Sequence, residues 1–579
     1  MRISLLFKIL VVLSTALILV YLYMNMQKPM IQVSSPDQCM SCHSDYESLD
    51  SSHPVEVFGC ASCHGGNKFA TKKADAHVNI VKNPSRLEHS ERFCAECHSE
   101  IVTRIKMNIM ETQRGIKDVL HEQWVEKSTG LDDKKFAQEL VDSHFSKACA
   151  ACHVNQKEEI FHDQSLAKGG GCADCHRIED KKKEGKHPKF STKIPSKNCV
   201  KCHNRSNRIG TSYFGKFESE GYGTPYIDGN FSHKLDSTRF YYDLPADVHH
   251  EKAGLDCIDC HTEKGVMGDG LEHKHMEDAV DIKCKDCHTP TFKEYLPDTL
   301  AATLIDLNKN IPTPKEIAYS GKKNAPLYNL QKNDENITFY RKRDGKSFDM
   351  TKMSDKPYHN LDIHNRLDCS SCHAQWIASC YGCHEVYFED GKQYDWQKQK
   401  ITNGKWLELR SFLRFESPSL GIGYNEKIMP FAPGCQVIGT VFKDDKVEQF
   451  HAMAMSGWEP HTTGKSRTCV DCHIDPASLG LGRGTLDIKK DKITFTPIYD
   501  SRKSGLDIDY PIDSFVSVEG KQFQTTSREN ARSFNKKELN KIVNAYKCIL
   551  CHRTYEDKIY KDFNVSKILF KEGKTQCSK

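Results

Sequence analysis

Residues 369–384, CSSCHAQWIASCYGCH, contain two copies of one five-residue motif, Cys-x-x-Cys-His, with six residues between them. Two thiols three positions apart suit the two vinyl groups of one haem, and the histidine that follows suits a position beside the iron. The motif is the attachment signature of c-type haem. We therefore expect covalently bound haem wherever it recurs.

The motif recurs along the whole chain, where twelve copies use 24 of the 26 cysteines and leave only Cys435 and Cys577 outside. We number the copies motifs 1 to 12 in chain order. They are Cys39/Cys42/His43, Cys60/Cys63/His64, Cys94/Cys97/His98, Cys149/Cys152/His153, Cys172/Cys175/His176, Cys199/Cys202/His203, Cys257/Cys260/His261, Cys284/Cys287/His288, Cys369/Cys372/His373, Cys380/Cys383/His384, Cys469/Cys472/His473 and Cys548/Cys551/His552. The prediction is twelve haem c groups, with the motif histidines as proximal iron ligands.

Two other uses of paired cysteines agree less well with this pattern. Zinc sites combine two Cys-x-x-Cys pairs for each ion and do not require a histidine after each pair. A disulfide framework gives no reason for a histidine after every second cysteine. Haem attachment explains both the thiols and the histidines.

The composition agrees with a core that is filled partly by a cofactor. Hydrophobic residues make up 38% of the 579 residues, which is below the roughly 45–50% that is usual for globular chains. Bound haems would supply the missing apolar mass. The formal net charge is +4, and haem propionates would turn it negative, so the charge gives no case for nucleic-acid binding.

The N-terminus carries Arg2 and Lys8, followed by an apolar run from Ile9 to Tyr23. Counted from Leu5 to Met24, the segment is about long enough to span a bilayer. We interpret residues 1–30 as a retained signal anchor, with a cleaved signal peptide as the alternative. The prediction is a single-pass protein of the inner (cytoplasmic) membrane, with the bulk of the chain on the periplasmic side.

The spacing of the motifs predicts the domain organisation. Eight motifs crowd into an expected domain over residues 31–300, and four lie in an expected C-terminal region over residues 369–579. Residues 301–368 form a motif-free connection with a β-hairpin at Asp344-Gly345. The predicted fold class is an irregular, loop-rich multihaem cytochrome with short α-helices wrapped around haems, some β-hairpins in the C-terminal half and one N-terminal transmembrane helix. Residues 101–143 are the exception, since they are expected to form helices that pack as a pair.

Sixteen histidines outside the motifs are available as distal iron ligands. The strongest candidates lie some five to twelve residues before a motif, as distal ligands of neighbouring haems often do in multihaem proteins: His53, His89, His144, His162, His187, His249, His250, His273, His275, His364 and His461. The other five are His77, His121, His233, His359 and His451. An iron with two imidazoles is coordinatively full, which favours electron transfer, whereas catalysis at haem needs an open iron.

The motifs, the additional histidines and the apolar N-terminus resemble those of multihaem c-type cytochromes. Residues 39–66, CMSCHSDYESLDSSHPVEVFGCASCHGG, are similar over a short stretch to membrane-anchored quinol-oxidising cytochromes of the NapC/NirT type. Ser51-Ser52-His53 holds the place of that family's Ser-x-His, and Ser44 stands where the family commonly has a methionine. The resemblance implies a quinol pool or a periplasmic electron donor, and redox proteins or an extracellular acceptor as further partners.

Two functions follow from these observations. The first is an electron carrier that passes electrons from a quinol or a periplasmic donor to a terminal reductase or an extracellular acceptor. The alternative is a multihaem reductase of a small nitrogen or sulfur oxyanion, with one open haem. Residues favouring the alternative lie in the motif-poor region: Cys435, Trp458, His461, Arg410 and Arg414. No catalytic residue is assigned by the sequence.

Overall fold

A computed structural model describes residues 37–44, 49–152, 154, 170–178, 187–203, 212–218, 232–234, 240–297, 299–354, 357–434, 436–489, 492–503 and 506–575. The chain divides into two compact bodies. The N-terminal body comprises residues 1–84 and 179–190, and the main body comprises residues 85–178 and 191–579. The domain boundaries predicted at residues 300 and 368 both lie inside the main body.

The described part of the N-terminal body consists of short elements around motifs 1 and 2. They are η1 (Gln38–Ser41), α2 (Val55–Phe58), α3 (Ala61–His64), α4 (Lys73–Ala76) and β2 (Lys189–Phe190). The Asp37 carboxylate accepts hydrogen bonds from the backbone N–H groups of Cys60 and Ala61, at 2.5 and 3.0 Å. This carboxylate therefore satisfies donors at the start of α3 that have no partner within the helix.

The main body begins with the helices that were predicted around residues 101–143. They are α5 (Leu87–Phe93), α6 (Ala95–Met107), α7 (Ile109–Thr112), α8 (Arg114–Leu120), η2 (His121–Glu126), α9 (Lys134–His144), η3 (Phe145–Cys149) and η4 (Ala150–Cys152). Asp133 caps α9 by accepting from the N–H groups of Lys135 and Phe136, as expected for an N-cap aspartate. Helix η2, which continues α8, packs against α9, so the predicted helical pair is confirmed.

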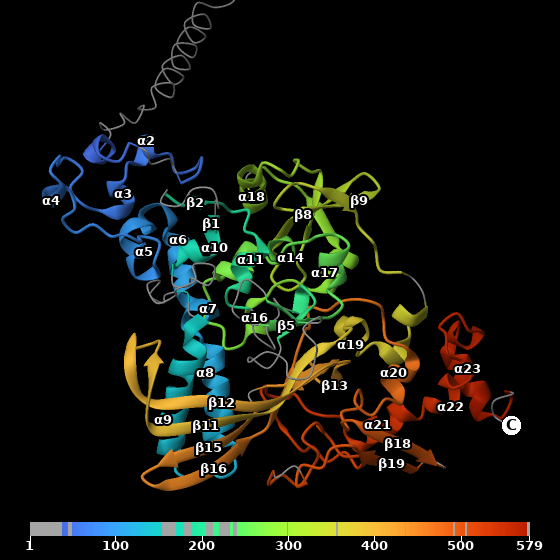
Figure 1. Ribbon diagram of the computed structural model, residues 1–579. Coiled ribbons are helices and arrows are strands. Elements are labelled where there is room, and N and C mark those ends of the chain that lie inside the picture. The colour runs from blue at the N-terminus through green and yellow to red at the C-terminus, as the bar shows by residue number, and fades with distance from the viewer. Residues whose placement is uncertain are drawn as a thin grey trace, which may run out of the picture. The chain divides into compact units, whose positions relative to one another are not determined.

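A four-stranded sheet lies against this helical pair (Figure 1). Its strands, in spatial order, are β12 (Lys400–Glu416), β11 (Ile377–Asp395), β15 (Val437–Lys443) and β16 (Lys446–Ala452). Strand β11 runs antiparallel to β12 and parallel to β15. Its register with β12 shifts between Tyr381 and His384, where Gly382 has φ 55°. A Cβ on Gly382 would lie 2.4 Å from Ile512 Cδ1, and the positive φ would strain other residues, so glycine is favoured there.

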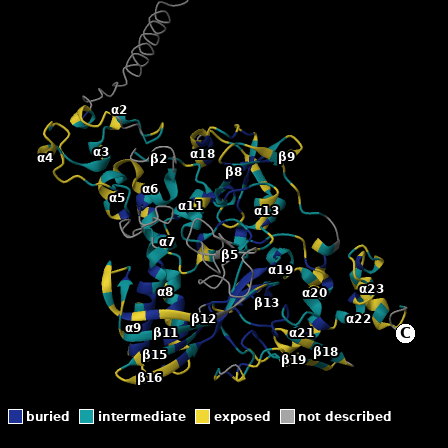
Figure 2. Ribbon diagram, in the orientation of Figure 1, coloured by how far each residue is buried: buried dark blue, intermediate teal, exposed yellow. Residues whose placement is uncertain are grey.

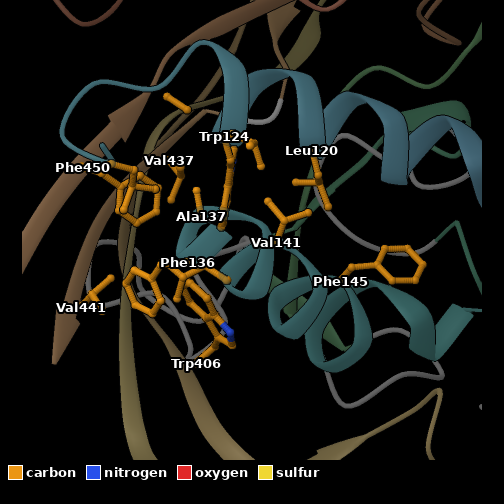
Figure 3. Packing of buried hydrophobic residues seen from close by; sticks show 14 of the residues in the cluster. Leu120, Trp124, Phe136, Ala137, Val141, Phe145, Trp406, Val437, Val441 and Phe450 are labelled. Atoms are coloured by element: carbon orange, nitrogen blue, oxygen red, sulfur yellow. The ribbon is translucent and has the colours of Figure 1, made fainter. Parts of the chain in front are cut away.

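The main hydrophobic core lies between the helical pair and the sheet (Figures 2 and 3). Trp124 is 2% exposed, and its ring centre lies 5.9 Å from that of Trp406 and 5.4 Å from that of Phe450. Leu140 and Val441 fill the space beside these rings. Burial of apolar surface, at about 25 cal/mol per Å², makes this cluster the principal contact between helices and sheet.

A second, antiparallel sheet has the order β10-β9-β8-β7-β6. Its strands are β6 (Thr291–Glu294), β7 (Glu316–Tyr319), β8 (Pro326–Asn333), β9 (Asn336–Tyr340) and β10 (Ser347–Asp349). Strands β9 and β10 pair antiparallel across Asp344-Gly345, and Gly345 has φ 73°. The predicted hairpin is therefore confirmed. The core under this sheet includes Cys260 and Cys287 of motifs 7 and 8.

The remaining strands form smaller sheets. They are β13 (Ser419–Ile422), β14 (Ile428–Pro433), β17 (Ala454–Gly457) and β20 (Thr525–Thr526) in one sheet, β18 (Gly484–Lys489) with β19 (Lys492–Pro497), and β3 (Lys216–Glu218) with β5 (Phe240–Asp243) and β4 (Ser232–Lys234). Strand β1 (Arg177–Ile178) is short.

Most of the other helices are short, and many of them carry motifs. They are α10 (Cys172–His176), α11 (Ser196–Val200), α13 (Val248–Glu251), α14 (Cys257–Cys260), α15 (Glu263–Met267), α16 (Met276–Ala279), α17 (Cys284–His288), α18 (Leu300–Asn308), η7 (Pro357–His359), η8 (Asp362–His364), α19 (Cys369–His373), α20 (Cys469–His473), α21 (Lys536–Val543), α22 (Tyr546–Ile549), η9 (Lys558–Tyr560) and α23 (Phe563–Lys571).

The predicted fold class is wrong. The described residues form extended sheets, including a strand of 19 residues, rather than a loop-rich chain with occasional hairpins. The prediction gave most weight to motif spacing, whereas residues 377–457 pair as strands with partners far along the chain. Such long-range pairing depends on tertiary context more than on local propensity.

The predicted single-pass location in the inner membrane is also corrected. Across the residues that the structure describes, no helix combines the length and the apolar character needed to cross a bilayer. The predicted anchor, residues 1–30, lies outside the described residues.

Candidate haem centres

Ten of the twelve motifs form a single helical turn, namely all except motifs 4 and 10. In motif 2, for example, the His64 N–H donates to the Cys60 carbonyl at 2.9 Å. Residues three and four apart share one face of a helix, so each turn directs two thiols and one imidazole to the same side. His98 of motif 3 has φ −117° and ψ 35°, which ends the turn and kinks α6. His153 of motif 4 lies outside the described residues.

Four of these helices end before their motif does, and in motif 7 only the histidine, His261, lies beyond α14. In motifs 1, 6 and 12 the second cysteine and the histidine lie beyond the last residue of η1, α11 and α22. Their N–H groups still donate to the carbonyl of the first cysteine, at 2.9–3.2 Å. The turn is therefore kept, although a helix this short has few internal hydrogen bonds to continue it. The residues concerned are Cys42, His43, Cys202, His203, Cys551 and His552.

The predicted wrapping of the chain around every haem site is also incomplete. One cysteine in each of motifs 1, 3, 8 and 12 is exposed. By contrast, the Cys469 thiol of motif 11 belongs to a buried residue. Each exposed cysteine remains an attachment candidate because of its spacing within the motif. The exposed cysteines are Cys42, Cys97, Cys284 and Cys551.

Six motif histidines each face a histidine from outside the motifs. The pairs are His43–His77, His64–His187, His261–His461, His288–His249, His373–His359 and His473–His364, with ring centres 6.1–6.5 Å apart. A metal–imidazole bond of about 2.0 Å, with about 1.1 Å from nitrogen to ring centre, places two imidazoles on one metal about 6.2 Å apart. The observed separations match this spacing.

In several of these histidines, a hydrogen bond to one ring nitrogen determines which nitrogen is left to bind a metal. In motif 2, His64 Nδ1 lies 2.7 Å from the Val81 carbonyl, and in motif 11, His473 Nδ1 lies 2.7 Å from the Ile542 carbonyl. A carbonyl oxygen only accepts, so Nδ1 carries the proton and Nε2 keeps its lone pair. The same holds for His176, His187, His288, His359, His373 and His461. A ligand imidazole with its far nitrogen held by the protein is the usual arrangement at metal sites.

Burial keeps several of these imidazoles neutral. It lowers the pKa of His261 to about 3 and that of His364 to about 4. Burial also lowers the pKa of His187, His288, His461 and His473. Iron binding requires the neutral ring, so these side chains are ready to act as ligands without first losing a proton.

Motif 6 lies between two other motifs. On one side, Cys202 Sγ lies 3.6 Å from the Cys152 carbonyl oxygen of motif 4. On the other side, His203 lies close enough to His261 of motif 7 for its charge to lower the pKa of that ring. Cys202 and His203, which lie beyond the end of α11, are therefore each close to a neighbouring motif.

The series of neighbouring motifs continues from motif 7 through the main body. The Cys199 thiol of motif 6 lies within hydrogen-bonding reach of Cys257 in motif 7, and Cys284 of motif 8 lies within such reach of Cys369 in motif 9. The Arg467 N–H, beside motif 11, donates to the carbonyl of the second cysteine of motif 9 at 2.9 Å. The motifs therefore follow one another in space as 4, 6, 7, 8, 9 and 11, without motif 10 between 9 and 11.

Tyr560 joins motifs 11 and 12. Its hydroxyl donates to the His552 carbonyl at 2.8 Å and is also a hydrogen-bond partner of the Cys469 thiol.

In the N-terminal body, motifs 1 and 2 lie together, because Asp37, Cys39 and Cys60 have ligand atoms within 4.8 Å of one another. This cluster is made of thiols of two adjacent motifs and the carboxylate that caps α3.

Motif 10 does not fit haem as the helical motifs do. It lies in strand β11, where Cys383 pairs with Val437 and His384 with Ile438 of β15. Adjacent strand residues point to opposite faces, so the Cys383 thiol and the His384 imidazole are on opposite sides of the sheet. His384 Nε2 lies 3.4 Å from the Thr440 hydroxyl oxygen. We assign no step of the function to this motif.

The structure brings only part of the predicted distal set to motif histidines. His187, His249, His364 and His461 face motif histidines, whereas five other strong candidates have different contacts: His53 with Asp50, His89 with Phe93, His144 with Glu385, His250 with Phe214 and His273 with Asp269. Burial lowers the pKa of His275, whose Nδ1 is buried, and His162 lies outside the described residues.

Two facing histidines, His77 and His359, were not among the strong candidates. His359 lies ten residues before Cys369, within the upstream window, but His364 lies nearer to the motif. The structure uses both, since His359 faces motif 9 and His364 faces motif 11. His77 lies 17 residues before Cys94, outside that window, so no local signal marks it.

His144 differs from the other candidates because its Nε2 lies 2.7 Å from a carboxylate oxygen of Glu385. Its ring is packed against Trp124 and Trp406, with centres 4.8 and 4.9 Å away. Burial alone would lower the pKa of His144, but Glu385 raises it to about 10. His144 is therefore a buried imidazolium in an ion pair, a form that cannot bind iron through Nε2.

Taken residue by residue, the helical motifs fit covalent haem. They offer paired thiols on one side of a turn, and at six of them the motif imidazole faces a second imidazole across a gap of the right width for one iron. The buried Asp247 carboxylate accepts from His249 Nδ1, at 2.8 Å, and so holds the ring that faces His288 of motif 8 in place.

Comparisons with known proteins found no match: no family model matches the chain, and no curated protein or solved structure matches it significantly.

Proposed function

We propose that the protein is a multihaem c-type cytochrome that carries electrons between redox partners. The observation that carries this proposal is the set of six imidazole pairs, each joining a motif histidine to a second histidine at 6.1–6.5 Å. Bound haem supplies one-electron oxidation and reduction at its iron. Each of these imidazole pairs would hold one haem iron from both sides and leave no position for a substrate, which favours electron transfer.

The chain's own residues support this role in two ways. Nδ1 hydrogen bonds to backbone carbonyls hold the ligand rings in fixed orientations, so that little rearrangement accompanies a change of charge. The contacts between motifs 6, 7, 8, 9, 11 and 12 bring successive attachment sites side by side. Successive neighbours of this kind make a continuous route through the main body.

The proposed partners follow from the resemblance to multihaem cytochromes. The donor is a quinol or a redox protein, and the acceptor is a redox protein, a terminal reductase or an extracellular acceptor. No nucleic acid is proposed, because the charge of the chain is nearly balanced.

The alternative reductase remains a hypothesis with less support. Of the residues that favoured it, Cys435 lies outside the described residues. His461 faces His261, and its ring is nearly parallel to that ring, at 8°. The Arg414 guanidinium donates to the Tyr499 hydroxyl. These contacts give His461 and Arg414 roles other than substrate binding.

The test is to produce the full chain in a host that attaches c-type haem and to count haems by intact mass and peptide mapping. We expect covalent haem on the ten helical motifs and predominantly low-spin iron by magnetic spectroscopy. The double variant Cys369→Ala/Cys372→Ala is expected to lose one haem and keep the rest. A chain without covalent haem, or one whose irons are mainly high-spin, would contradict the proposal.

A further inference from the structure

One ligand pair differs from its neighbours in how the outer nitrogen of an imidazole is held. His249 faces His288 of motif 8, with ring centres 6.1 Å apart, and its Nδ1 lies 2.8 Å from Asp247 Oδ1. In the adjacent pairs the far nitrogen donates to a backbone carbonyl: His461 to Glu459 at 3.1 Å beside motif 7, and His373 to Gly464 at 3.1 Å in motif 9.

Asp247 is built into this position. It is 2% exposed and is the N-cap of α13, where Oδ1 also accepts from the His249 N–H at 3.0 Å. Its second oxygen, Oδ2, accepts from the Thr463 N–H at 2.7 Å. The carboxylate is thus fixed at both oxygens and screened from water, which strengthens its interaction with the imidazole.

A carboxylate that accepts from a metal-bound imidazole makes that ligand more basic. A more electron-donating ligand stabilises oxidised iron relative to reduced iron, and hydrogen bonding around the ligand is one of the means by which a protein sets a haem potential. A backbone carbonyl carries no net charge and has a weaker effect. The pair at motif 8 should therefore behave differently from the pairs on either side.

We propose that Asp247 is a positioning residue that lowers the reduction potential at motif 8 below the potentials at motifs 7 and 9. This inference rests on the proposed electron-carrier function. Motif 8 lies between the other two in space, since Cys284 contacts Cys369 of motif 9 and Cys287 shares a core with Cys260 of motif 7. An electron that moves from motif 7 to motif 9 through motif 8 meets an uphill step at motif 8. This step separates the route into two segments.

The test is a spectroelectrochemical titration of the full haem-loaded chain carrying Asp247→Asn. Asparagine can still accept from His249 Nδ1 but has no charge. We expect one centre to move to higher potential, by about 59 mV for each tenfold loss of preference for oxidised iron. The other centres should move less, including that of motif 7, although His461 also lies near the Asp247 charge.

Two further variants keep the result interpretable. Asp247→Ser retains a residue able to cap α13, and it should give the same upward shift without introducing an amide group beside Thr463. Asp286→Asn removes the same charge within motif 8, where the carboxylate accepts from Lys283 and Gly321 N–H groups and not from a ligand ring. It should shift the potential much less than Asp247→Asn.

The outcomes separate the two proposals. If no centre moves in either Asp247 variant, or if Asp286→Asn moves the same centre equally, Asp247 does not tune motif 8 through His249. Those results would leave the electron-carrier proposal intact. If the wild-type chain carries no haem, the electron-carrier proposal fails first, and the mass measurement shows this before any titration.

Discussion

Replacement of His461 by alanine is expected to convert one low-spin iron centre into a high-spin centre. His461 and His261 are both half-buried, and their rings are nearly parallel, at 8°, with centres 6.2 Å apart. Removal of one imidazole leaves motif 7 with a single axial ligand, because alanine has no atom that binds iron. Magnetic spectroscopy of the oxidised protein should show a high-spin signal equivalent to one iron, and the reduced protein should gain carbon monoxide binding at one site.

His250→Ala is the matched control. His250 is a predicted distal ligand in the same part of the fold, but its ring contacts Phe214 and Tyr213 at 4.6 and 5.4 Å. Its removal should leave the spin state of every iron unchanged. A low-spin spectrum in His461→Ala, or a high-spin signal in His250→Ala instead, would show that the observed imidazole pair is not the ligand set of motif 7.

Replacement of Glu385 by alanine is expected to destabilise the main body by about 3–5 kcal/mol near pH 6, the range for breaking a buried ion pair. Glu385 holds the buried His144 imidazolium at 2.7 Å between Trp124 and Trp406. The pKa of His144 is about 10 in the folded state, against about 6.5 in the unfolded chain. The contribution of the pair is therefore fully present below pH 6.5 and is lost as the pH rises towards 10.

Urea unfolding of the wild type and the variant at pH 6 and at pH 9.5 measures this dependence. The difference in unfolding free energy should be large at pH 6 and should shrink at pH 9.5. Glu389→Ala is the control on the same strand, because Glu389 is 38% exposed and lies 3.7 Å from Lys443; a surface pair of this kind contributes about 0–1 kcal/mol. An equal loss in both variants, or no change with pH, would rule out the buried pair as the cause.

Structural features that depend on interactions between residues close in the sequence could be predicted from the sequence. The helical turn of a motif follows from five consecutive residues, and ten motifs adopt it. The helices around residues 101–143 and the hairpin at Asp344-Gly345 also follow from short-range patterns, and both are present. Motif 10 shows the limit, because the same five-residue pattern lies in strand β11 with partners on β12 and β15.

Histidine pairing was beyond local inference. His261 and His461 are 200 residues apart in the sequence, and His64 and His187 are 123 apart. Proximity to a motif in sequence identified His364 as a ligand candidate, but in space it faces the histidine of motif 11 and leaves that of motif 9 to another partner. The upstream histidine of motif 4 has the same spacing, yet a carboxylate from β11 reaches its ring.

The positions of the thiols, the histidine beside each pair and the number of additional imidazoles can be read from the sequence alone, and they are the basis of the haem proposal. Which imidazoles face one another, which motifs are neighbours and which motif lies in a sheet became known only from the folded chain. The physical reason is that thiol spacing is set by a few consecutive backbone torsions. Imidazole pairs and strand pairs form instead between segments that only the packing of the folded chain brings together.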